Sequence, residues 1–168
     1  TVMYVSSVLR GHEQWIPIWL PDAVYLDWQL RLASQLQALP LELICKPHPE
    51  GILGGKVHPL EEVAPTRYES FETLIDQVDV FVFDYAKSTT FWKALCTDAP
   101  VVLIDLGHAS FNKHLSAEAE QRCDIVEGYF GDDNLPYVDS EALSEKVLKH
   151  RATDGSFFRR LLAGEART

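Results

Sequence analysis

A lysine and a histidine lie in one proline-flanked turn, in the stretch Lys46-Pro47-His48-Pro49-Glu50-Gly51. An ammonium group and an imidazole can together bind a phosphate, and the imidazole can exchange a proton near neutral pH. The prolines restrict the backbone on either side of His48, which holds its ring in one place. On spacing alone, a plain turn in which His48 caps a nearby carbonyl is an equal alternative. Glu50 suits a sugar or ribose hydroxyl, or it is simply solvated.

Three hydroxyl residues, Ser88, Thr89 and Thr90, follow Lys87 at the expected start of a helix. A helix N-terminus carries free N–H groups and a partial positive charge, and hydroxyl groups add donors without adding negative charge. Such an end can bind phosphate. Serine and threonine are also common helix caps, and for an isolated pair capping is the more frequent role. The further hydroxyls and the neighbouring Lys87 favour phosphate.

The elements that must position these residues alternate along the chain. Because the central strands are continuous apolar runs separated by helical patterns, we expect an α/β fold, a Rossmann-like parallel sheet with helices on both faces. The expected strands are Met3–Val5, Leu41–Cys45, Val78–Asp84, Pro100–Asp105 and a short edge strand at Ile125–Val126, followed by an acidic turn region at Gly128–Pro136. The expected helices are Asp22–Leu39, Phe71–Gln77, Ser88–Thr97, Ser140–Arg151 and Phe157–Ala163, with Glu118–Arg122 as a polar helical stretch and Ile52–Tyr68 mainly loop.

In an open parallel sheet, ligands bind beyond the carboxyl ends of the strands. Four groups of residues fall there: Ser6–His12, Lys46–Gly51, Asp84–Thr90 and Asp105–His108. In the first group, Arg10 and Gly11 are candidates because glycine permits close approach of the backbone, although an ordinary loop is the simpler interpretation. For Asp84 and Asp105, which end central strands, we expect structural roles.

Charge limits the partners of the chain. The 168 residues carry a formal net charge of −10, with 25 acidic and 15 basic side chains, and 46% are hydrophobic, enough for one domain with a core. The negative field repels nucleic acid and anionic membranes, so neither is an expected partner. It also repels a nucleotide, so local cations such as Lys46, His48 and Lys87 must hold one.

Other common site types have no signature in the sequence. The three cysteines lie far apart and are odd in number, which predicts reduced thiols of an intracellular protein. The histidines lack metal-ligand spacing, and there is no Walker loop, dinucleotide fingerprint or nucleophile elbow, so we expect no metal and no cofactor. No signal peptide or bilayer-spanning apolar run is present. Because the chain begins at Thr1, we expect residues 1–168 to be a single domain excised from a longer chain.

The stretch Lys46–Gly51, followed by Asp84–Thr90, Ala94-Leu95 and Pro100–Asp105, resembles the C-terminal half of GT-B glycosyltransferases. The likeness is to bacterial capsule and surface-polysaccharide enzymes. These include CDP-glycerol glycerophosphotransferases, polysialyltransferases and Kdo transferases, which share a His-Pro motif and a Ser-Ser or Ser-Thr motif. The likeness covers roughly Leu41 to Asp105 by motif and the remaining chain by element order.

This resemblance implies half of a GT-B fold that binds a nucleotide-sugar donor, with a glycan as acceptor. It implies that His48 contacts the donor phosphate as the catalytic residue, and that Ser88 and Thr89 bind phosphate at the helix end. The catalytic base of those families comes from an N-terminal domain. We therefore expect a missing domain or partner subunit, an incomplete enzyme in isolation, and a place in the cytoplasm or at the inner membrane face.

Two alternatives stay open. A sugar-nucleotide 2-epimerase shares the two-domain architecture, but the pairing of a His-Pro turn with a Ser-Thr helix start fits the polysaccharide transferases better. A non-catalytic α/β binding module would use Ser88 as a cap and His48 as a turn residue. Under the transferase interpretation the candidate binding residues are Arg10, Gly11, Lys46, His48, Glu50, Lys87, Ser88, Thr89 and Thr90.

Overall fold

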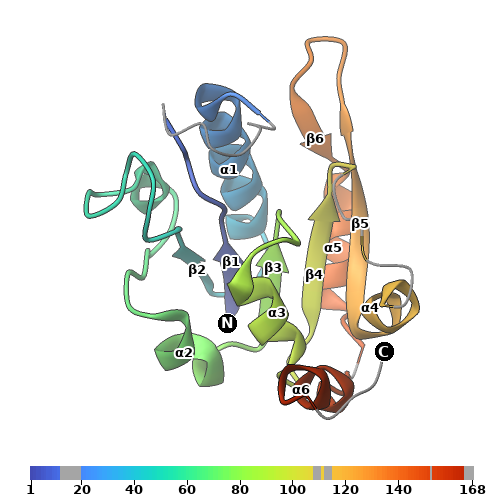
Figure 1. Ribbon diagram of the computed structural model, residues 1–168. Helices are drawn as coiled ribbons and strands as arrows, with labels where there is room; N and C mark the ends of the chain where they lie inside the picture. The colour runs from blue at the N-terminus through green and yellow to red at the C-terminus, as the bar shows by residue number, and fades with distance from the viewer. Residues whose placement is uncertain (12–19, 108–110, 112–114, 152, 165–168) are drawn as a thin grey trace.

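Six strands form one sheet in the order β2-β1-β3-β4-β5-β6 (Figure 1). The computed structural model describes residues 1–11, 20–107, 111, 115–151 and 153–164. Strands β1 to β5 run parallel, and β6 runs antiparallel to β5. The protein therefore has the expected α/β, Rossmann-like fold. The strands are β1 (Val2–Val5), β2 (Leu43–Lys46), β3 (Val80–Phe83), β4 (Val101–Asp105), β5 (Cys123–Phe130) and β6 (Pro136–Val138).

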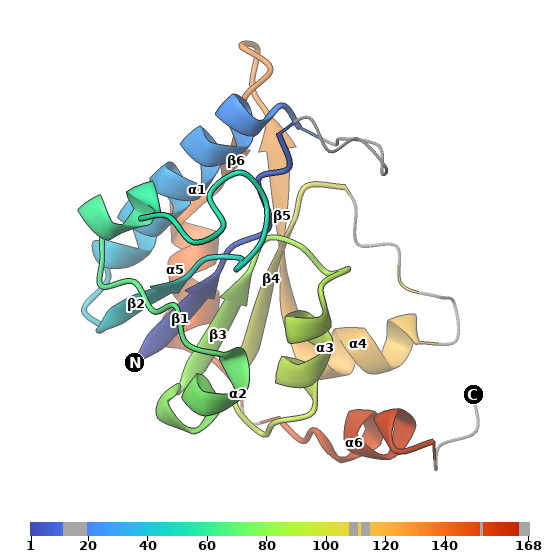
Figure 2. The ribbon, with the colours of Figure 1, turned by 60° about the vertical axis from the view of Figure 1, so that its left-hand side comes forward.

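Helices cover both faces of the sheet, as predicted (Figure 2). One face packs against α1 (Asp22–Gln37), the short 3-10 helix η1 (Pro59–Glu62) and α5 (Ser140–Leu148). The other face packs against α2 (Phe71–Leu74), α3 (Thr89–Leu95), α4 (Ser116–Arg122) and α6 (Ser156–Leu162), and a second 3-10 helix, η2 (Ile75–Gln77), follows α2.

The central strands are buried on both faces because their side chains alternate between two apolar layers. Tyr4 and Val82 point towards the α1 side, where Trp28 of α1 packs with them. Phe81 and Phe83 point to the opposite side, where Phe83 meets Phe91 of α3 edge-on, with ring centroids 5.3 Å apart. The continuous apolar character of β1 and β3 that suggested a parallel sheet thus corresponds to burial on both sides.

Two expectations at the far side of the sheet were right only in part. Cys123–Phe130 forms β5, an eight-residue interior strand rather than a short edge strand, because it pairs with both β4 and β6. The region 128–136 is only partly a turn, since its two ends pair in an antiparallel hairpin. Tyr129 and Tyr137 stack across that hairpin with ring centroids 5.9 Å apart. Asn134, with a φ of 60°, accommodates the left-handed backbone of the turn.

The strand order creates a topological switch point between β1 and β3. The chain leaves β1 to form β2 on one side, then crosses to form β3 on the other side of β1. The connections that leave neighbouring strands at such a point diverge, which opens a crevice at their carboxyl ends. In this chain the diverging connections are those after β1 and β3, with the Lys46–Gly51 turn beside them after β2.

Candidate functional site

A cavity of about 760 Å³ lies at the carboxyl ends of β1, β2 and β3, at the switch point. It brings together the sequence-predicted candidates Arg10, Lys46, His48, Glu50, Lys87, Ser88, Thr89 and Thr90. Gly11 is not part of its lining, and the candidate group members His12 and His108 lie outside the described residues. Another cavity, of about 600 Å³, lies between the end of α1 and α5 and holds none of these candidates.

Lys46, the last residue of β2, supplies a buried ammonium group to the cavity. The residue is 5% exposed, and its Nζ donates to the carbonyl oxygen of Pro47 at 3.2 Å. Burial lowers the pKa of Lys46, while the carboxylates of Glu69 and Glu72 oppose that shift. Among the described residues, no carboxylate lies within 4.0 Å of this ammonium. Its remaining donor capacity suits an anion that enters the cavity.

His48 presents one ring nitrogen to its own turn. Its Nδ1 accepts a hydrogen bond from the backbone N–H of Glu50 at 3.2 Å, so the neutral ring carries its proton on Nε2. Burial lowers the pKa of His48, the Glu50 carboxylate opposes this, and the charges of Lys46 and Arg10 lower the pKa further. Near neutral pH the ring is therefore a neutral donor through Nε2–H.

Ser88 caps α3, as the plain structural alternative predicted. Its Oγ accepts the backbone N–H of Phe91 at 3.1 Å and lies 3.1 Å from the hydroxyl oxygen of Thr90. The two hydroxyls therefore form one pair at the cavity wall, beside the exposed side chains of Lys87 and Thr89. Capping and ligand binding are compatible, because the Ser88 hydroxyl accepts from the backbone through one lone pair only.

Arg10 and Gly11 are held by a carboxylate and by a neighbouring loop. Their backbone N–H groups donate to Asp22 at the start of α1, at 3.0 and 2.5 Å. Gly11 has a φ of 65°, and a methyl group on it would lie 2.1 Å from the Ile52 side chain. Glycine at position 11 therefore lets the loops after β1 and β2 pack closely together. Arg10 lines the cavity.

Sequence reasoning missed one wall of the cavity, formed by Tyr68, Glu69, Ser70, Phe71 and Glu72. This wall reaches the site because residues 65–67 run beside β2. The Cys45 N–H donates to the Pro65 carbonyl and the Arg67 N–H to the Cys45 carbonyl, both at 2.8 Å. The wall carboxylates already have partners, since Glu69 pairs with Arg67 and Glu72 with Lys93. No local pattern in the sequence signals this long-range pairing.

A buried carboxyl group lies beneath the site, at the end of β3. Asp84 is buried, and its Oδ2 accepts a hydrogen bond from the Tyr4 hydroxyl at 2.7 Å. Burial raises the pKa of Asp84 to about 6, against the opposing effect of the Tyr4 hydrogen bond. The Tyr25 hydroxyl and the Trp28 indole N–H of α1 are also buried, and both act on Asp84 to lower its pKa. Neither meets the geometry of a regular hydrogen bond with a described residue. Burial and the bond to Tyr4 are consistent with the structural role that the sequence predicts for Asp84.

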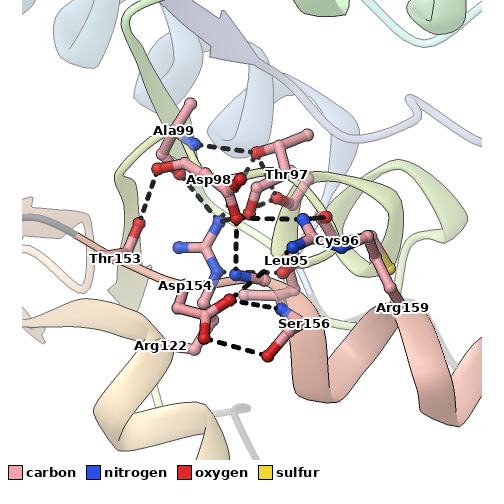
Figure 3. A network of polar contacts seen from close by, with 12 residues as sticks. Leu95, Cys96, Thr97, Asp98, Ala99, Arg122, Thr153, Asp154, Ser156 and Arg159 are labelled. Atoms are coloured by element: carbon pink, nitrogen blue, oxygen red, sulfur yellow. Dashed lines mark hydrogen bonds and ion pairs between the residues drawn. The ribbon is translucent and has the colours of Figure 1, made fainter.

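Helix α3, which begins at the site, is fixed at its other end by Arg122 of α4 (Figure 3). The guanidinium donates to backbone carbonyl oxygens in and just after the last turn of α3: Ala94, Leu95, Thr97 and Ala99. The Ala94 carbonyl also accepts the Thr97 N–H at 3.0 Å. The carbonyls at the end of a helix lack the full set of N–H partners and carry partial negative charge, so a buried cation suits this position. The polar stretch predicted at Glu118–Arg122 thus contains a buried residue.

Two other features, a metal-ligand cluster and a membrane-spanning helix, are absent from the described residues. Within them, no group of three or more histidine, cysteine or acidic side chains lies close enough to hold a metal ion. No described helix is long and apolar enough to cross a bilayer. No protein-family model, curated protein or solved structure matches the chain significantly.

Proposed function

We propose that this chain is the donor-binding domain of a glycosyltransferase of the surface-polysaccharide type. It binds a nucleotide-sugar in the cavity at the ends of β1, β2 and β3. A second domain or subunit supplies the acceptor site and the group that activates the acceptor. The chain works in the cytoplasm or at the inner membrane face, where nucleotide-sugars are used to extend a glycan.

One observation carries this proposal: the Lys46 ammonium is buried, lines the cavity and has one carbonyl partner among the residues that the structure describes. A buried charge without a carboxylate in direct contact is costly, and a ligand phosphate would offset that cost. His48 adds an Nε2–H donor, and Arg10 adds a guanidinium in the same cavity. The net charge of −10 makes such a cluster the natural place for an anion.

These groups suit the departure of a nucleotide through its phosphate. When the bond between the anomeric carbon and the phosphate oxygen breaks, negative charge grows on that oxygen. Fixed donors that already point at this position stabilise the charge without having to reorganise. Lys46 and His48 are held by the proline-flanked turn, and Ser88 is held by the first turn of α3.

A calorimetric titration of the protein with CMP, CDP, UDP, GDP and inorganic pyrophosphate tests the proposal. We expect at least one nucleotide to bind. We expect Lys46→Met to weaken that binding by about tenfold to a hundredfold, because a hydrogen bond to a charged group contributes roughly 1.5–3 kcal/mol. Methionine retains the unbranched side chain and removes only the charge and its donors.

Lys56→Met is the matched control, because Lys56 is exposed and its Nζ bonds to the Ile52 carbonyl outside the cavity lining. This variant should bind like the parent protein. Absence of binding at millimolar ligand, or equal losses in the Lys46 and Lys56 variants, would leave the non-catalytic module as the better interpretation.

A further inference from the structure

Tyr68 has an unusual orientation for a tyrosine at the rim of a cavity. The residue is 49% exposed and lines the cavity, yet its hydroxyl is fully engaged. That hydroxyl accepts the backbone N–H of His58 at 2.8 Å and donates to the Glu61 carboxylate at 2.7 Å. Exposed tyrosines usually turn the hydroxyl to water and bury the ring. Here the hydroxyl is bound, so the surface left for a ligand is mainly the ring.

The ring is positioned from two sides before any ligand binds. The backbone just before Tyr68 is attached to β2 through the Arg67 N–H, which donates to the Cys45 carbonyl at 2.8 Å. The hydroxyl is attached to η1, whose first turn is capped by the buried His58 through its Nδ1. A side chain held in this way loses little conformational freedom on binding, which favours affinity.

The surroundings of the ring differ from the cationic part of the cavity. The neighbouring wall carries Glu69 and Glu72, and Arg67 and Lys93 already neutralise them. This wall offers no free cation to a second phosphate, and the ring offers an aromatic face. The uncharged, flat part of a ligand suits this wall, and the phosphate suits Lys46 and His48. A cavity of about 760 Å³ has room for both parts.

We infer that the ring of Tyr68 stacks on the base of the bound nucleotide, and so selects nucleotides over sugar phosphates at this site. The inference rests on the proposed phosphate-binding function of the cavity and adds the residue that recognises the base. Stacking on an aromatic face tolerates different bases, so Tyr68 favours a planar ring rather than one particular base.

The test compares compounds that share a phosphate and differ in the ring. The protein and its variants Tyr68→Leu and Tyr68→Phe are titrated with CMP, UMP, AMP and ribose 5-phosphate. We expect the parent protein to bind at least one nucleotide about tenfold more tightly than ribose 5-phosphate, and Tyr68→Leu to abolish that preference. Tyr68→Phe retains the ring but loses the hydroxyl contacts that position it, so its preference should lie between those of the parent protein and Tyr68→Leu. Ring-current shifts of the Tyr68 NMR signals on adding nucleotide, but not ribose 5-phosphate, give an independent readout.

The outcomes separate this inference from the proposed function. If Tyr68→Leu binds ribose 5-phosphate like the parent protein and loses only the nucleotide preference, stacking is supported and the variant is shown to be folded. If phosphates bind but nucleotides have no advantage, or if Tyr68→Leu weakens all ligands equally, stacking is overturned while the phosphate site stands. If no phosphate compound binds, both fail.

Discussion

Replacing Arg122 with methionine is expected to lower the free energy of unfolding by about 2–4 kcal/mol, a large share of the roughly 5–15 kcal/mol that stabilises an ordinary domain. Arg122 is 3% exposed and donates over 2.8–3.0 Å to four carbonyl oxygens, those of Ala94, Leu95, Thr97 and Ala99. Methionine has no donor, so the carbonyls of Leu95, Thr97 and Ala99 would lose this partner, whereas the Ala94 carbonyl would keep the Thr97 N–H. Urea denaturation measures the loss. The urea concentration at the midpoint should fall, while the dependence of the unfolding free energy on urea concentration should stay the same.

Arg159→Met is the matched control in the same network (Figure 3). Its guanidinium donates to the Cys96 carbonyl at 2.7 Å and to Asp98 at 2.9 Å, but the side chain is 46% exposed. Exposed pairs of this kind contribute about 1 kcal/mol or less, because water replaces the lost partner. If the two variants were equally stable, burial of Arg122 would not be the source of its effect.

The position of Arg122 also explains what local sequence cannot predict. The stretch Glu118–Arg122 is polar by composition, and a polar helix is normally a solvated face. Arg122 is buried because the end of α3 lies against it, and those carbonyls come from residues more than twenty positions earlier in the chain. A charged residue whose partners are backbone atoms leaves no pattern of residue types to recognise.

The parts that were predictable share one property: their signal is contained in a few neighbouring residues. β3 is recognisable because Val80–Phe83 is continuously apolar, and α3 because Ser88 precedes it as a cap. Parallel topology then places the turns after β2 and β3 at one edge, which is why Lys46, His48 and Ser88 line one cavity.

The parts that were not predictable depend on pairing between distant segments. The interior position of β5 is hidden in the sequence because its partner β6 is only three residues long and begins at Pro136. Tyr68 reaches the cavity only because Thr66 pairs with Cys45 of β2. The position of Gly11 beside Ile52, rather than at the cavity, likewise depends on how the loops after β1 and β2 meet.

The buried carboxyl of Asp84 is expected to make the protein more stable as the pH falls from about 8 to about 4. The pKa of Asp84 is about 6 in the folded protein, against an ordinary value of 3.8 for an exposed aspartate. Between these values the folded state holds a proton that the unfolded state has lost, so unfolding becomes easier as the pH rises. The full difference between the two pKa values corresponds to about 3 kcal/mol of unfolding free energy. About 2 kcal/mol of this develops between pH 8 and pH 4.

Asp84→Asn provides the reference, because it cannot take up this proton. Acidification also protonates surface carboxylates such as Glu69 and Asp98. Because their pKa values are lowered in the folded protein, protonating them makes the protein less stable at low pH. Both proteins carry these groups, so the difference in their unfolding free energies isolates Asp84. A difference that stayed constant from about pH 8 to about pH 4 would contradict a raised pKa for this carboxyl.

Tyr4→Phe should raise the pH at which the Asp84 carboxyl ionises in the folded protein. The Tyr4 hydroxyl donates to the Asp84 carboxylate and so favours its ionised form, which opposes the effect of burial. Without that donor, the pKa of Asp84 should rise further, and the stability should be lost at a higher pH than in the parent protein. The carboxyl ¹³C shift of Asp84 during a pH titration reports both midpoints directly. A downward shift in Tyr4→Phe would mean that the hydroxyl stabilises the protonated acid instead, and that Asp84 holds the end of β3 as a donor.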